Sequence, residues 1–182
     1  MSRGWRWAVL LAGACILSAC DVGVTTVRLK GGSNYSAGAY VQTGAQNGTN
    51  AVVVRNSPFP PEAVLAALRA RYQSNQYRFA LGTPAGWNGY TVVIGFGLPP
   101  VGSQNLCGNP DLPQAPSPAG VTALVANYCY GNRLVTEALG RTTGVTGPDD
   151  PRFRDLIGQT IAELFASDEY ADLGGLGFRP LP

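Results

Sequence analysis

Residues 121–141 read VTALVANYCYGNRLVTEALGR, and this stretch decides the fold that we expect. Two hydrophobic, β-branched runs, 121–130 and 133–141, flank Gly131-Asn132, and a two-residue turn of this kind joins the strands of a β-hairpin. If the turn closes tightly, Tyr130 lies opposite Arg133. The next pair on the same face is then Tyr128 with Val135.

This register divides the hairpin between two faces, because successive side chains of a strand point to opposite sides. The face with Tyr128, Tyr130 and Glu137 mixes aromatic with charged residues, so we expect it to be partly exposed. Arg133 and Arg141 lie four positions from Glu137 on either side, which favours a surface ion-pair ladder over a catalytic acid. The opposite face should point inward, and it contains Val121, Ala123, Val125, Cys129 and Leu134.

Two amphipathic segments predict helices. Asp150-Pro151 combines an N-cap acid with an N1 proline, and Pro60-Pro61 likewise suits a first helical turn. The acids Asp149, Asp150 and Asp155 are explained by capping and by the helix dipole. The second helix has a hydrophobic stripe of Phe153, Leu156, Ile157, Thr160, Ile161, Leu164 and Phe165, and the first, ending near Tyr72, has one of Val64, Leu65, Leu68 and Tyr72.

Three further runs predict strands at 51–54, 77–81 and 90–96, and the last two are close enough in sequence to pair as a hairpin. Two one-sided helices and one sheet predict an α+β fold: a two-layer sandwich, with a mostly antiparallel sheet and both helices on one face. The domain spans residues 51–166, and a glycine- and proline-rich tail, 167–182, follows it.

Residues 20–50 are rich in glycine, serine and asparagine, so we expect a flexible tether. The alternative is an added strand that contains Val22, Val24, Val27 and Leu29.

The composition excludes several classes of function. The chain has no histidine, which excludes Ser-His-Asp and Cys-His catalysis and histidine metal sites. No Gly-x-Ser-x-Gly or Ser-x-x-Lys motif is present. With 13 basic and 11 acidic residues, the chain lacks the strongly basic balance of a nucleic-acid-binding protein. Asp168, Glu169 and Asp172 lack the alternating spacing of a calcium loop. We therefore expect no catalytic residue, no metal, no cofactor and no enzymatic activity.

The segment Leu17-Ser18-Ala19-Cys20 ends a charge-free run, 7–17, that follows Arg3 and Arg6. At 11 residues this run is too short to span a bilayer. Basic start, short hydrophobic run and final cysteine resemble the signal peptide of a bacterial lipoprotein. The alternatives are an ordinary cleaved signal or an uncleaved anchor. Cys15 fits the pattern less well, because Ala12 occupies its leucine position.

The resemblance implies that residues 1–19 are removed and that Cys20 carries a diacylglyceryl group and an N-acyl chain such as palmitate, which anchors the protein stably in a membrane. The protein would then face the periplasm of the bacterial cell envelope. Asp21 resembles an inner-membrane retention signal and favours that membrane slightly over the outer one.

Cys107 and Cys129 remain after this processing, and an even pair in an exported protein predicts a disulfide bond. The alternative, a redox pair, lacks the Cys-x-x-Cys spacing. The bond would pin the proline-rich loop 98–120.

Aromatic residues near glycine turns are the candidate partner-binding set: Trp87, Tyr90, Tyr128 and Tyr130. Our leading hypothesis is a non-enzymatic, lipid-anchored envelope protein that binds a protein or envelope component. The alternative is a cell-wall glycan-binding protein or a carboxylate-dependent hydrolase. A hydrolase requires a second acid beside Glu137 in a pocket near Trp87.

Overall fold

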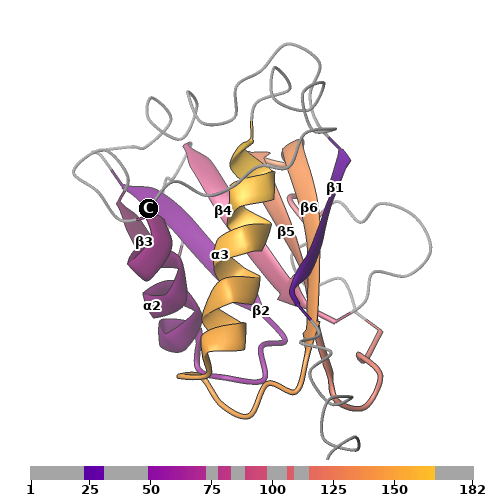
Figure 1. Ribbon diagram of the computed structural model, residues 1–182. Helices are drawn as coiled ribbons and strands as arrows, with labels where there is room; N and C mark the ends of the chain where they lie inside the picture. Colours follow the sequence, from indigo (N-terminus) through magenta and orange to yellow (C-terminus); the bar gives the residue numbers. More distant parts are fainter. Residues whose placement is uncertain are drawn as a thin grey trace, which may run out of the picture.

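The computed structural model describes residues 23–30, 49–72, 78–82, 89–97, 106–108 and 115–166 of the protein, without the side chains of residues 27–30 and 72. Two helices and six strands occupy these ranges (Figure 1). In chain order they are β1 (Thr25–Lys30), β2 (Asn50–Arg55), α2 (Pro61–Tyr72), β3 (Phe79–Leu81), β4 (Tyr90–Phe96), β5 (Val121–Tyr130), β6 (Arg133–Thr143) and α3 (Pro151–Phe165). None of the described helices is long and hydrophobic enough to cross a membrane.

The fold is α+β, and its sheet is mixed. The strands lie in the order β1-β6-β5-β4-β2-β3. Antiparallel pairing joins β1, β6, β5 and β4, whereas β2 is parallel to both β4 and β3. The expectation of a mostly antiparallel sheet therefore missed the two parallel pairings of β2. Helix α2 carries the chain from the end of β2 back to the start of β3, which makes these two strands parallel.

The predicted hairpin between residues 77–81 and 90–96 is wrong. Strand β2 lies between β3 and β4, and all three strands run in the same direction. The strand expected at 77–81 is also shorter, since β3 begins at Phe79.

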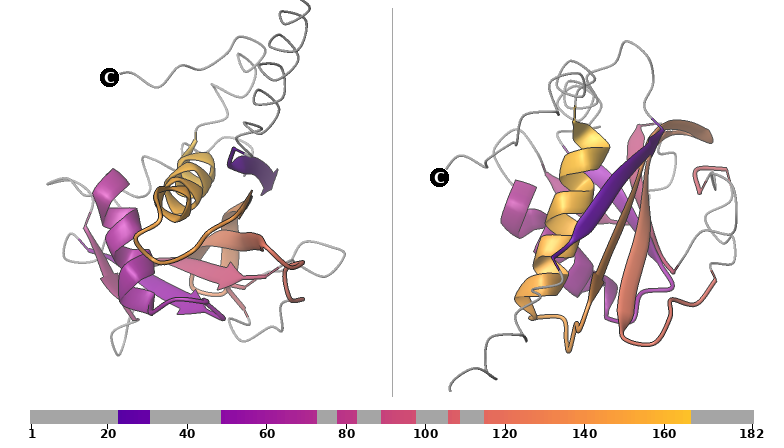
Figure 2. Two further views of the ribbon diagram at one scale, coloured as in Figure 1. Left: turned by 60° about the horizontal axis from the view of Figure 1, so that its bottom comes forward. Right: turned by 45° about the vertical axis from the view of Figure 1, so that its right-hand side comes forward.

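Both helices lie on the same face of the sheet, where they pack against each other (Figures 1 and 2). Every second side chain of the strands points to this face, and these side chains fill the space between the sheet and the helices. Val92, Ile94 and Phe96 belong to the core on this side, in line with the strand predicted at 90–96. The main core therefore lies between the sheet and the two helices.

Helix α3 has the predicted start and the predicted buried stripe. The carboxylate of Asp150 accepts a hydrogen bond from the backbone N–H of Arg152 at 2.9 Å, which caps the first turn. At the other end, the hydroxyl of Thr136 in β6 donates to the carbonyl of Leu164 at 2.9 Å. Gly140 of β6 lies directly beneath the helix: a Cβ atom there would clash with Thr160 and lie 2.9 Å from Cδ1 of Leu156. The absence of a side chain at Gly140 lets α3 approach the sheet.

The hairpin of β5 and β6 forms as predicted, but its register changes after the first two pairs. Tyr130 pairs with Arg133 and Cys129 with Leu134, whereas Tyr128 pairs with Thr136. Val135 is thus the extra residue of a β-bulge. The bulge moves every later residue of β6 by one position relative to β5.

The faces expected for the hairpin are therefore only partly right. Tyr128 is buried on the helix side instead of being partly exposed. Glu137 is fully buried as well, and it pairs with Asn127 instead of Ala126. The face with Val125 and Cys129 is buried as predicted, but it lies on the side away from the helices.

Strand β1 corrects the expected tether. Residues 25–30 pair with β6 from Thr25 opposite Arg141 to Lys30 opposite Glu137, with one irregularity. This is the alternative of an added strand, and Val24 before it packs against the main core. Residues 1–22 and 31–48, which include Cys20, lie outside the described residues, as do Trp87 and the tail 167–182.

Candidate functional site

An aromatic cluster occupies the end of the sheet where β4 begins and β5 ends. The ring of Tyr90 stacks on Tyr128 with centroids 5.0 Å apart, and it contacts Tyr130 at the same distance. Phe165, at the end of α3, meets Tyr128 edge-on at 5.3 Å. The cluster thus brings together three of the four predicted partner-binding aromatics.

The three tyrosines differ in what they can contact. Tyr128 is fully buried, and burial, with a smaller effect of Tyr90, raises the pKa of its hydroxyl far above the ordinary value. Tyr128 is therefore a core residue. Tyr90 is half-buried, and Tyr130 is 52% exposed. Tyr130 is the exposed large hydrophobic residue of the described ranges, and its ring packs against the ring of Tyr90.

The predicted disulfide bond between Cys107 and Cys129 is confirmed, and the two Cα atoms are 5.4 Å apart. The bond attaches part of the loop before β5 to the sheet face opposite the helices. Leu106 and Cys107 form a second, smaller core there with Val93, Val125 and Cys129. Part of the sheet is therefore covered on both sides.

A polar pair lies within this second covered region. The amide of Asn127 donates a hydrogen bond from Nδ2 to Oε2 of Glu137 at 2.8 Å. Its Oδ1 accepts one from the backbone N–H of Leu106 at 3.3 Å. Asn127 and Glu137 are both fully buried, so the expected surface ladder of Glu137 with Arg133 and Arg141 is wrong. The bulge at Val135 is the cause.

The other predicted acids remain ordinary helix-start residues where they are described. Asp149 and Asp155 are exposed. Asp150 accepts hydrogen bonds from the Arg152 side chain, from the backbone N–H groups of Thr146 and Arg152, and from the Thr146 hydroxyl. These contacts, led by the one with the Arg152 side chain, hold the pKa of Asp150 well below its usual range. Asp168, Glu169 and Asp172 lie outside the described residues.

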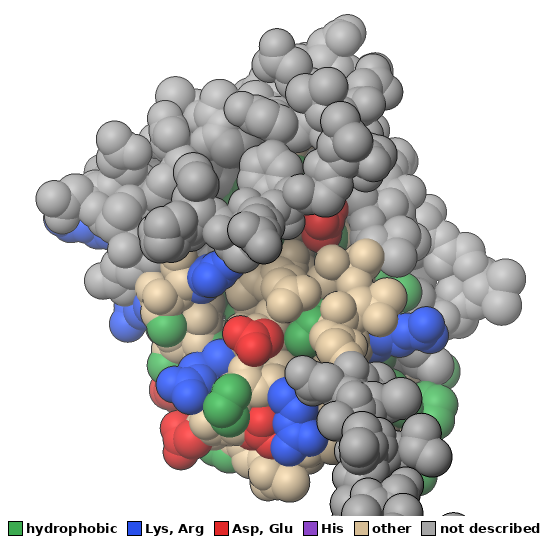
Figure 3. Space-filling model, in the orientation of Figure 1, with side chains coloured by type: hydrophobic (Ala, Val, Ile, Leu, Met, Phe, Trp, Pro, Cys, Tyr) green, Lys and Arg blue, Asp and Glu red, His purple; other side chains and the backbone are tan. Residues whose placement is uncertain are grey.

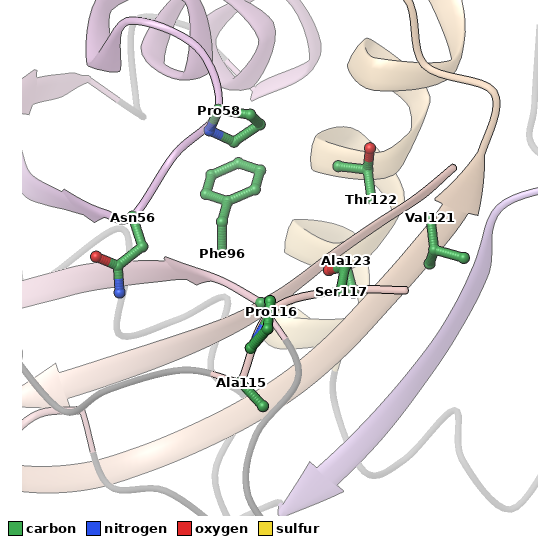
Figure 4. A pocket seen from close by; sticks show the side chains of 10 residues that line it. Asn56, Pro58, Phe96, Ala115, Pro116, Ser117, Val121, Thr122 and Ala123 are labelled. Atoms are coloured by element: carbon green, nitrogen blue, oxygen red, sulfur yellow. The ribbon is translucent and has the colours of Figure 1, made fainter. Parts of the chain in front are cut away.

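A cavity of about 330 Å³ opens at the opposite end of the sheet from the aromatic cluster (Figure 4). Pro58 lies beside the ring of Phe96, while Pro116 and Ser117 come from the segment before β5. Its polar lining consists of Asn56, Ser117 and Thr122, and none of the lining residues is charged. A cavity of this size and polarity can hold a small neutral group, but it offers no acid or base.

Asn56 was not predicted from the sequence. It follows β2 with a φ of 53°, in the left-handed region that asparagine tolerates better than most residues. This conformation turns the chain sharply from β2 toward Pro58 at the cavity. The pair Asn56-Ser57 before a proline run was the available signal, since asparagine and serine favour turns.

The outer surface of the helices carries no dominant charge. Figure 3 shows basic and acidic side chains interspersed over α2 and α3. Within the described ranges, no group of three or more cysteine, aspartate or glutamate side chains is arranged to hold a metal ion.

No family model matches the chain, and no curated protein matches it. Among solved structures, the PelC dodecamer from Paraburkholderia phytofirmans is similar with a TM-score of 0.44 and 14% sequence identity. The alignment covers 79% of this chain and 99% of the PelC chain. A methionine variant of the same dodecamer gives a TM-score of 0.45 with the same identity and coverage. At these values the likeness carries no argument about ligand or assembly.

Proposed function

We propose that this protein is a lipid-anchored protein of the bacterial envelope, which is not an enzyme and binds a protein or another envelope component on the periplasmic side. The segment Leu17-Ser18-Ala19-Cys20 carries the proposal, because it ends a short hydrophobic run after two arginines in the manner of a lipoprotein signal. Asp21 supports retention in the inner membrane.

The burial of Glu137 supports binding over catalysis. A glycan hydrolase would require two carboxyl groups that converge on a substrate. Glu137 accepts a hydrogen bond from the amide of Asn127, beneath the disulfide-linked segment, and the cavity lining is uncharged. The hydrolase alternative required a second acid beside Glu137 in a pocket, and the burial of Glu137 weighs against that alternative.

The exposed ring of Tyr130 supports a partner surface at the end of β5. A half-exposed tyrosine supported by a second aromatic ring presents a rigid contact area at a small entropic cost. Tyr130 and Tyr90 are held in this way between two strands of the sheet. We propose that they contact the partner.

The finer description of the fold belongs to the same proposal. The helix-side core and the alternation of β4 and β5 support a two-layer sandwich, in which the Cys107 segment covers part of the outer sheet face.

The anchor is tested by mass spectrometry of the mature protein from membranes. We expect an N-terminal Cys20 with the added mass of a diacylglyceryl group and an acyl chain. Cys20→Ala should abolish acylation, whereas Cys15→Ala, the matched control in the same segment, should leave it intact. A mature N-terminus at any other residue would refute the anchor.

The partner surface is tested by photo-crosslinking in intact cells. A photoreactive phenylalanine analogue at Tyr130 should yield a discrete crosslinked product. The same analogue at Gln159, exposed on α3, serves as the control. Equal products from the two positions would argue against a partner at Tyr130.

A further inference from the structure

The chain enters the fold at a defined end of the sheet. Thr25 is the first residue of β1, and its Cα partner is Arg141, close to the last residue of β6. Figure 1 shows that β1 begins at the lower end of the sheet, where α3 also begins. Val24 is fixed as well, because its side chain packs against the main core.

The segment between the proposed lipid and the fold is short. From Cys20 to Val24 the chain advances by four residues, which span at most about 14 Å even when fully extended. A flexible tether of about thirty residues would have reached roughly 30 Å on average and left the domain free to rotate. The position of β1 removes this freedom.

We infer that the end of the sheet formed by Pro118–Val121 and Thr143–Thr146 faces the lipid surface, and we call it the anchor-side end. The inference rests on the acylation of Cys20 in the proposed function. The two segments are joined by a hydrogen bond from the N–H of Gly144 to the carbonyl of Gly120, at 3.0 Å. Val121 of β5 pairs with Thr143 of β6, and β6 is the strand next to β1.

The side chains at this end suit contact with lipid headgroups. Pro118, Ala119 and Gly120 are exposed and uncharged, so their approach to the headgroups removes no charge from water. The charge of Asp150 is matched by Arg152, at 3.1 Å. The cavity lined by Ser117 and Thr122 opens at the same end and therefore faces the membrane.

The aromatic cluster lies at the other end. Seven residues separate Ala123, level with Arg141 and Thr25, from Tyr130, which corresponds to about 24 Å along a strand. The Gly131-Asn132 turn follows immediately. A partner at Tyr130 would therefore meet the protein on the side that points away from the bilayer.

Energy transfer on vesicles tests this orientation. The acylated full chain is reconstituted in phosphatidylcholine–phosphatidylglycerol vesicles that contain an acceptor-labelled headgroup lipid. Donor dyes are attached through Ala119→Cys, at the anchor-side end, or through Arg133→Cys, beside the Gly131-Asn132 turn at the opposite end. We expect at least twofold higher transfer from the label at position 119.

A linker variant is the control. Insertion of twenty glycine and serine residues between Val22 and Gly23 leaves the described fold unchanged but frees its orientation, so the difference between the two labels should shrink. Equal transfer from both positions in the uninserted chain would overturn the orientation while leaving the anchor intact. Failure of the chain to float with the vesicles would overturn the anchor, and the orientation with it.

Discussion

At the scale of single residues, the buried side chain of Asn127 makes two hydrogen bonds within the domain. Its two amide atoms serve different partners: Oδ1 accepts from the backbone of Leu106, and Nδ2 donates to Glu137. One side chain therefore connects the disulfide-linked segment to β5 and β6. Because all of these groups are buried, neither contact can be replaced by bulk water without opening the structure.

Asn127→Ala should lower the free energy of unfolding by at least about 2 kcal/mol, because it removes a hydrogen-bond partner from the buried Leu106 N–H and from Glu137. Urea denaturation measures the effect. Gln159→Ala, on the exposed face of α3, is the control and should change stability by less than about 0.5 kcal/mol. An Asn127 variant as stable as this control would contradict the buried contact.

At the scale of elements, the close approach of α3 to β6 depends on Gly140. Gly140→Ala should cost about 1–3 kcal/mol, because the new methyl group overlaps Thr160 and crowds Leu156. Gly147→Ala is the matched control, since nothing lies within 4 Å of its Cβ position.

A double-mutant cycle distinguishes steric overlap from a backbone effect. Thr160→Ala in the Gly140→Ala background should recover part of the lost stability, as residues in contact are energetically coupled. Strict additivity of the two substitutions in thermal or urea unfolding would show that the overlap with Thr160 is not the cause.

The N-cap of α3 predicts a pH dependence. Because the folded protein holds the pKa of Asp150 below that of an unfolded aspartate, near 3.9, its stabilising contribution is complete above about pH 5 and is lost as the pH falls below 4. Asp150→Asn should therefore be less stable than the wild type at pH 7, and the difference should diminish at pH 3. Urea midpoints at the two pH values measure this, and a constant difference would contradict it.

The sequence predicted those elements whose signal is local. Both helices were located from their hydrophobic stripes and their prolines, and the hairpin from Gly131-Asn132. Strand pairing depends on residues far apart in sequence, so neither β2 between β3 and β4 nor the pairing of β1 with β6 was favoured. The bulge at Val135 has no sequence signal of its own, yet it decides that Glu137 is buried.

The residues of the candidate site were likewise predicted only in part. The cysteine pair was identified because export and cysteine count limit the alternatives. Tyr128 was misplaced because it packs in the helix-side core, where Phe165 of α3 contacts its ring, whereas Tyr130 was correctly expected to be exposed. The cavity escaped prediction because its walls come from three separate segments, near Asn56, Phe96 and Ser117.

At the scale of the whole molecule, the Cys107–Cys129 bond attaches the segment with Leu106 and Cys107 to strand β5. Replacement of both cysteines by alanine should lower the free energy of unfolding by about 3 kcal/mol, the chain-entropy value for a closed loop of this length. The urea m-value should rise, because the unfolded chain becomes less compact. Dithiothreitol should shift the wild type in the same direction and leave the variant unchanged. An unaltered midpoint would show that the bond adds no stability.

In the exported protein that we propose, strand β1 also imposes an order on folding. Thr25 precedes its partner Arg141 by 116 positions, so β1 is the first of the described strands to be made and must wait for β6 before it can pair. A contact this distant in sequence forms late, because a long loop has to close first. In a chain that crosses the membrane with its N-terminus leading, β6 keeps an open edge until the segment next to the lipid returns to it. The time between translocation of β6 and this return is the period in which the immature protein is most exposed to pairing with a neighbouring copy.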